Sequence, residues 1–141
     1  SGNLGTLIAQ GDIGQNALTG DEVEYTLNSV SDPGISGAAT FAKRKNGTTL
    51  ITIALTGTTA GGDHPSHIHD NSAAMGGSIS IDLNNVDGDT GKSATHVTEK
   101  NDATAITYDE LINYNGYINV HLSSGNLGTL IAQGDIGSNV E

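Results

Sequence analysis

The fourteen residues SGNLGTLIAQGDIG occur twice in this chain of 141 residues, first at 1–14 and again at 124–137. Apolar and polar residues alternate within each copy, which predicts one β-strand per copy. A single domain needs only one copy of its closing strand. We therefore expect residues 1–14 to be the closing strand of a preceding module in a tandem array, or a copy added by design.

This repeat also predicts the domain organisation. Residues 15–20 form a linker, residues 21–137 form the domain, and residues 138–141 are a tail or the start of the next linker. A strand without its parent module keeps unpaired backbone groups and an apolar face. We expect it to pair with neighbouring identical modules, or with a second molecule through strand exchange.

The remaining pattern predicts an all-β fold. The chain has 20 glycines and many threonines, and short alternating segments such as GSISIDL and GYINVHL recur along it. Asn46-Gly47 predicts a hairpin turn, and the spacing of Thr107 and Glu110 predicts a capped helical turn near residues 108–113. We expect an antiparallel Greek-key β-sandwich of about seven or eight strands.

Charge and composition exclude several kinds of partner and site. The net charge of −11 disfavours binding to nucleic acid, because both would be negative. The sequence contains no run of about 18 apolar residues, so membrane insertion is not expected. The chain contains no cysteine, which rules out disulfides and thiolate metal ligands.

Three histidines are arranged as metal ligands would be. In His67-Ile68-His69, alternation along a strand places both imidazoles on one face, about 6.5 to 7 Å apart. His121 ends a segment in which Ile118, Val120 and Leu122 are expected to face the core, so that Tyr117, Asn119 and His121 face outward. If the two strands are neighbours, the three imidazoles share one outer surface.

Imidazole ligands suit copper and zinc, and affinity for Cu²⁺ exceeds that for Zn²⁺. His64 and Met75 are candidate additional ligands, and Asp70 and Asn119 are expected to lie beside the ligands. The alternative interpretation is that these histidines are surface residues held by local hydrogen bonds. We interpret His96 as a surface residue.

A weaker candidate is a calcium site at Asn84, Asp87 and Asp89, where carboxylates alternate around a glycine. The EF-hand pattern is incomplete there, and a solvated turn explains the same residues.

The chain resembles the CHRD (chordin-type) module over most of its length. The resemblance lies in His67-Ile68-His69 with the following Gly76-Gly77-Ser78-Ile79, in residues 115–121, and in residues 132–137. It implies a β-sandwich in a secreted or cell-surface protein. The histidine pattern also resembles the copper half of copper-zinc superoxide dismutase, but a cysteine pair and a zinc loop are missing here. Arg44, the only arginine, is not placed to guide superoxide.

Three functions are consistent with these observations. The first is an extracellular repeat module that holds one copper ion through His67, His69 and His121. The second is a purely structural or adhesive repeat of a surface or filament protein that self-associates by strand exchange. The third is a copper redox enzyme, for which the sequence offers the least support. No Ser-His-Asp or paired-carboxylate arrangement can be argued from the sequence.

Overall fold

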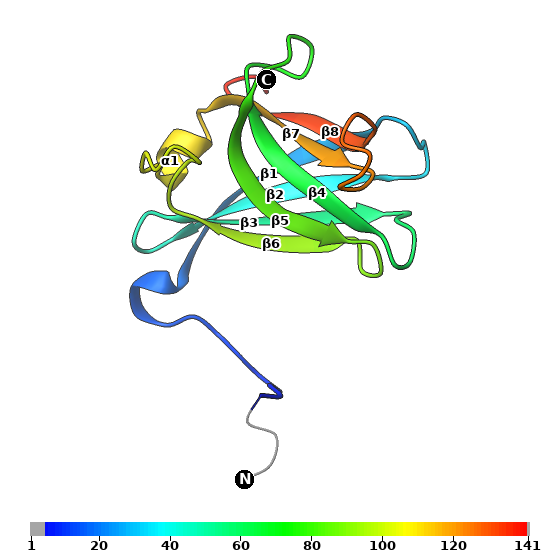
Figure 1. The fold of residues 1–141 in the computed structure, drawn as a ribbon. Coiled ribbons are helices and arrows are strands. Elements are labelled where there is room, and N and C mark those ends of the chain that lie inside the picture. Colours follow the sequence, from blue (N-terminus) through cyan, green and yellow to red (C-terminus); the bar gives the residue numbers. More distant parts are fainter. Residues whose placement is uncertain (1–4, 141) are drawn as a thin grey trace.

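A computed structural model describes residues 5–140 and shows eight antiparallel strands that close into a barrel (Figure 1). The strands are β1 (Leu18–Ser29), β2 (Ser36–Arg44), β3 (Thr49–Thr56), β4 (Asp63–Asp70), β5 (Ile79–Asp87), β6 (Lys92–Val97), β7 (Asn115–His121) and β8 (Leu130–Gly137). Two short helices accompany them, the 3-10 helix η1 (Gly14–Asn16) and α1 (Tyr108–Leu111). No helix among residues 5–140 has the length and apolar character needed to cross a membrane.

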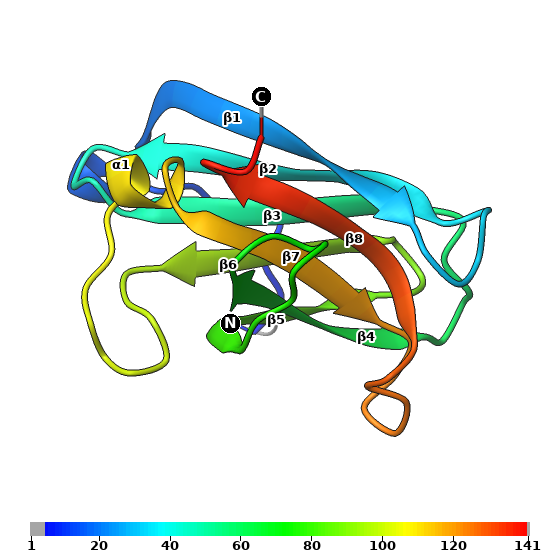
Figure 2. The same ribbon diagram turned by 90° about the horizontal axis from the view of Figure 1, so that it is seen from above.

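The strand order around the barrel is β1-β2-β3-β6-β5-β4-β7-β8, with β8 pairing back to β1 (Figure 2). The all-β antiparallel class is confirmed, but the open sandwich is wrong. The closing seam consists of two residue pairs, Asn28 with Gln133 and Ser29 with Ala132. A strand of a sandwich and a strand of a barrel show the same alternation. The two architectures are separated here by two short seams, β1 with β8 and β5 with β6, of which the second contains the single pair Asp87 and Lys92.

Local predictions are confirmed at the turn and at the helix. The Asn46-Gly47 turn joins β2 to β3 as a hairpin. The capping box is present, since Thr107 and Glu110 each accept a backbone hydrogen bond from the other. Strands β3 to β6 follow the order 3-6-5-4, which is that of a Greek key.

The core lies inside the barrel and is built from one face of each strand. Ile118 and Val120 are fully buried, as predicted. Leu122 was expected beside them and is instead 42% exposed, so that prediction is wrong. The reason is that β7 ends at His121, after a register shift between Val120 and His121 against β8. The alternation of the strand therefore does not extend to Leu122.

The two copies of the repeated segment differ in structure. The second copy contains β8, whereas residues 5–13 of the first copy belong to no strand and extend away from the barrel (Figure 1). Residues 1–4 lie outside the described residues. Strand β1 begins at Leu18, within the segment that we expected to be a linker.

Candidate metal centre

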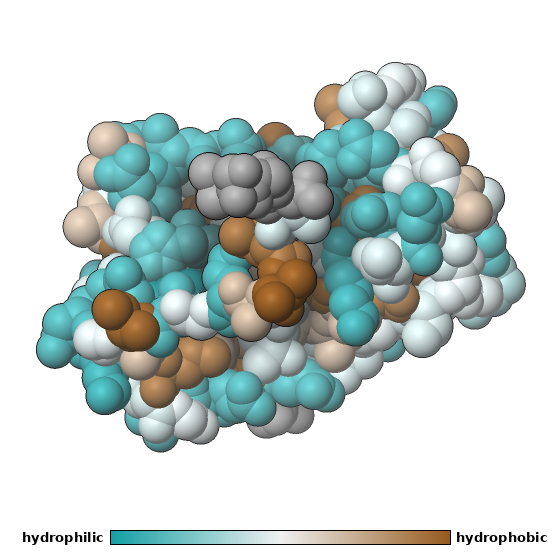
Figure 3. Space-filling model, turned by 90° about the horizontal axis from the view of Figure 1, so that it is seen from below, coloured by the Kyte–Doolittle hydropathy of each residue, from teal (hydrophilic) through white to brown (hydrophobic). Residues whose placement is uncertain are grey.

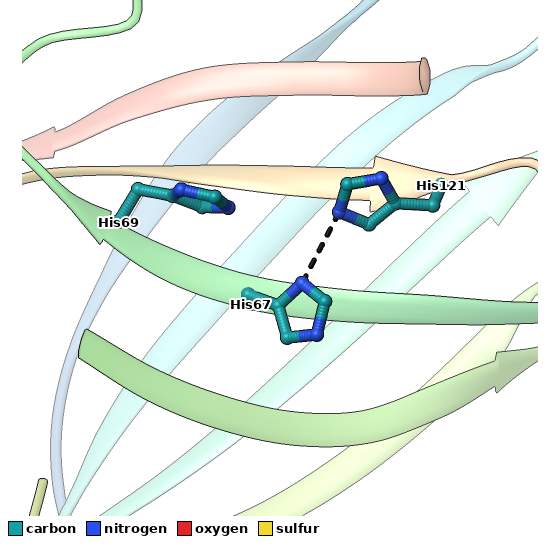
Figure 4. A group of neighbouring side chains, drawn as sticks. All are labelled: His67, His69 and His121. Atoms are coloured by element: carbon teal, nitrogen blue, oxygen red, sulfur yellow. Dashed lines mark hydrogen bonds between the residues drawn. The ribbon is translucent and has the colours of Figure 1, made fainter. Parts of the chain in front are cut away.

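The histidine-bearing strands are neighbours in the barrel, as the sequence analysis required. Strands β4 and β7 pair antiparallel, with His67 opposite Asn119 and His69 opposite Tyr117. One nitrogen from each of His67, His69 and His121 lies within 4.8 Å of the others (Figure 4). The three imidazoles therefore form a group that could hold a metal ion.

Two backbone carbonyls orient two of the rings. Nδ1 of His69 lies 2.9 Å from the carbonyl oxygen of Gly77, and Nδ1 of His121 lies 2.7 Å from that of Leu127. A carbonyl oxygen can only accept, so each ring carries its proton on Nδ1 and donates it there. Each Nε2 then keeps a free lone pair, which is the form that binds a metal.

His67 differs from the other two histidines, because it faces His121 with Nδ1 and not with Nε2. Its Nδ1 lies 3.1 Å from Nε2 of His121, and its Nε2 lies 3.8 Å from Oδ1 of Asp82. Without a metal, Nδ1 of His67 donates to the lone pair on His121. To offer Nδ1 as a ligand, His67 must instead carry its proton on Nε2, where Asp82 faces it.

Two connecting segments, residues 71–78 and 122–129, contact the outer face of β4 and β7. They supply the Gly77 and Leu127 carbonyls that bind the rings. Asn119 was expected to be exposed beside the ligands but is only 7% exposed, so that expectation is wrong. Its Oδ1 accepts a hydrogen bond from Nε2 of Gln133 at 2.8 Å.

Burial favours the neutral form of His67 and His121. It is the main cause that lowers the pKa of His67, with the neighbouring His121 lowering it further and Asp82 opposing the change. Burial also lowers the pKa of His121, against a smaller opposite effect of the Leu127 carbonyl. Nε2 of His69 is buried and has no hydrogen-bond partner among the described residues. A buried, unpaired lone pair of this kind fits a metal ligand.

The two other candidate ligands, His64 and Met75, and the expected neighbour Asp70 are not part of the three-histidine group. His64 is buried with its Nδ1 2.8 Å from the Leu122 carbonyl oxygen, and it is not part of the three-histidine group. Met75 is 81% exposed in the segment after β4. The Asp70 carboxylate accepts a hydrogen bond from the Tyr114 hydroxyl. In a strand, Asp70 and His64 share the face opposite to His67 and His69.

The residues proposed for calcium take part in loop hydrogen bonds. Asp87 accepts from the backbone N–H of Asp89 at 2.8 Å, and Asp89 accepts from that of Gly61 at 2.6 Å. The amide of Asn84 donates to the Ala94 carbonyl oxygen at 2.6 Å. The first bond lies at the turn between β5 and β6, the second joins that turn to the loop between β3 and β4, and the third joins β5 to β6.

Sequence reasoning missed Asp82 and the stacking role of Tyr117. Asp82 lies opposite His67 in the β4–β5 pairing, and the Tyr117 ring stacks on His69 with centroids 4.9 Å apart. Alternation in β5 already places Asp82 on the outer face, between Ile81 and Leu83. The register that brings it to His67 could not be derived, because residues 71–78 connect the two strands.

Comparison with protein-family models gives no match, and comparison with curated proteins gives none either.

Proposed function

We propose that this protein is a secreted or cell-surface repeat module of chordin type that binds one copper ion through His67, His69 and His121. The single observation that carries the proposal is the convergence of three imidazole nitrogens, two of them on rings whose tautomer is fixed by backbone carbonyls. Because the fold alone does not imply a function, the argument rests on this site.

Copper is preferred over the alternatives on chemical grounds. Three neutral imidazoles suit both copper and zinc, and Cu²⁺ has the higher affinity for a given nitrogen site. Calcium prefers oxygen ligands, which this group does not supply. Zinc is therefore the competitor to be tested.

We propose binding rather than a redox reaction. The guanidinium of Arg44 donates to Asp12, to the Asn16 carbonyl oxygen and to His96 at the end of β2. It is thus engaged in a separate cluster and is not available to guide an anion to the histidines.

The test is a titration of the metal-free protein with Cu²⁺, followed by calorimetry and by electron paramagnetic resonance. Wild type should bind one equivalent with nitrogen ligands, and His121→Ala should weaken binding about as much as His67→Ala. His96→Ala is the matched control and should bind as wild type does. Unchanged binding in all three variants would refute the assignment, and tighter binding of Zn²⁺ than of Cu²⁺ would replace the metal.

A further inference from the structure

The two copies of the repeated segment have the same residues in opposite environments. In β8, Ile131 and Ile136 are fully buried in the barrel. Their counterparts in the first copy are Ile8, which is fully exposed, and Ile13, which is 84% exposed. Figure 3 views the molecule from the side of the first copy and shows apolar side chains at the surface there. The first copy therefore exposes the apolar residues that the β8 position buries.

The β8 position has a strict steric requirement that the first copy also meets. A Cβ at Gly134 would lie 2.1 Å from the Thr26 carbonyl oxygen, so only glycine fits there. The counterpart is Gly11, around which a Cβ would meet nothing within 4 Å. An exposed segment has no need of this glycine, whereas a strand in the β8 position cannot do without it.

A polar requirement of the same position is met as well. Oδ1 of Asp135 accepts a hydrogen bond from the Ala73 backbone N–H at 2.8 Å, which attaches β8 to the segment after β4. Asp12 is the counterpart of Asp135 and pairs instead with Arg44, with Nη1 and Oδ2 2.6 Å apart. Asp12 is therefore able to accept the same hydrogen bond when it occupies the β8 position.

The first copy is held away from the β8 position of its own barrel. The Lys45 N–H donates to the Ala17 carbonyl oxygen and the Asn46 N–H to that of Gln15, each at 2.9 Å. These bonds attach the residues after the first copy to the β2–β3 turn. Since β2 and β8 lie on opposite sides of β1, entry into the same barrel would require breaking these bonds and crossing β1.

We propose that residues 7–14, the counterpart of β8, occupy the β8 position in a second copy of this chain and displace the β8 of that copy. The exchange buries and exposes the same residues, but it costs the freedom lost on association and the Asp12–Arg44 ion pair, so the wild type favours the monomer at low concentration. The exchange becomes favourable whenever the resident β8 is weakened. This inference concerns assembly and does not depend on metal binding.

The experiment uses matched substitutions in the two copies of the full chain. Ile131→Asp should disable β8, and Ile8→Asp should disable the same position of the first copy. We expect the Ile8→Asp variant to be a monomer as stable as wild type. Ile131→Asp should keep a cooperative unfolding transition and elute as a dimer or larger species, because the first copy of another molecule replaces β8. The Ile8→Asp/Ile131→Asp double variant should lose the transition.

A second substitution tests the steric requirement independently of charge. Adding Gly11→Val to Ile131→Asp should abolish both the association and the folding, while Gly11→Val alone should leave the wild-type transition unchanged. Unfolding of Ile131→Asp alone would overturn the proposal. A folded Ile131→Asp monomer would show that the segment enters its own barrel, which also overturns exchange between copies.

Discussion

The two faces of the β4–β7 pair are both buried, yet different interactions hold them in place. On the inner face, Ile68 lies opposite Ile118 and both are fully buried in the core. On the outer face, the imidazoles of His67, His69 and His121 are largely buried, and each ring has a directional hydrogen bond. The structure of the inner face therefore depends on the packing of apolar side chains. The structure of the outer face depends on the direction of hydrogen bonds and on the tautomers of the histidines.

The largest expected effect is on the inner face. Ile118→Ala should lower the free energy of unfolding by about 2–5 kcal/mol, because a cavity remains in a close-packed core. Leu122→Ala is the matched control, since Leu122 continues the same alternation but is exposed, and it should change stability by about 0.5 kcal/mol or less. Denaturant unfolding measures both, and equal losses would contradict the boundary of β7 at His121.

A metal ion should make the outer face contribute to stability as well. Copper at about 100 times its Kd should stabilise the native state by about 2.7 kcal/mol, provided that the unfolded chain does not bind it. His69→Ala should remove this stabilisation, because it deletes the one nitrogen of the three-histidine group that is buried without a hydrogen-bond partner among the described residues. Unfolding with and without Cu²⁺ measures the difference, and equal stabilisation of the variant would place the ion elsewhere.

A smaller effect is expected from Asp82→Asn. The carboxylate favours the His67 tautomer that frees Nδ1 for a metal, and loss of such a partner weakens binding by about 10- to 100-fold. Because Asp82 is exposed, we expect about the lower limit of that range. Glu24→Gln removes the same charge from the exposed face of β1 and should leave the copper affinity unchanged. A similar loss in both variants would indicate a general charge effect.

The smallest effect is on the pH dependence of the metal-free protein. Burial lowers the pKa of His67 and of His121 in the folded state, so the unfolded chain binds protons first. The stabilisation from neutral rings is therefore complete above the ordinary histidine pKa of about 6.5 and is lost as the pH falls through the lowered folded values. Unfolding between pH 7 and pH 5 should show a smaller loss in a His67→Gln/His121→Gln variant. A loss as large as in wild type would mean that other groups are responsible.

Copper binding should respond to acid in the same direction. Protons compete with the metal for the imidazole nitrogens, and the lowered pKa values of His67 and His121 delay that competition to a pH below 6.5. Titrations at stepped pH check this, and binding that stays constant down to pH 5 would argue against imidazole ligands.

The histidine group could be predicted because it depends on alternation and on one assumed strand pairing. His67 and His69 share a face in any strand, and His121 joins them once β4 and β7 are neighbours. Asp82 could not be placed, since its contact with His67 depends on a register across an eight-residue connection. The burial of Asn119 was missed because it depends on the pairing of β7 with β8, which places Gln133 beside it.

The class of the fold was predictable from the same alternation, but its closure was not. The β1–β8 seam pairs Asn28 with Gln133 and Ser29 with Ala132, and these polar and small residues carry no sign of a partner strand. The different fates of the two repeated copies could not be predicted at all, because identical residues have identical propensities. Tertiary context alone separates them.

The carbonyls of Gly77 and Leu127 perform the same task for two histidines, yet their positions should differ in the substitutions they tolerate. A backbone carbonyl is present whatever the side chain, and the Leu127 side chain is exposed, so a library randomised at position 127 should retain most residues. A Cβ at Gly77 would lie 2.0 Å from the Asp70 carbonyl oxygen, so the same library at position 77 should return glycine. Selection for metal binding would therefore retain glycine at position 77 and allow position 127 to vary.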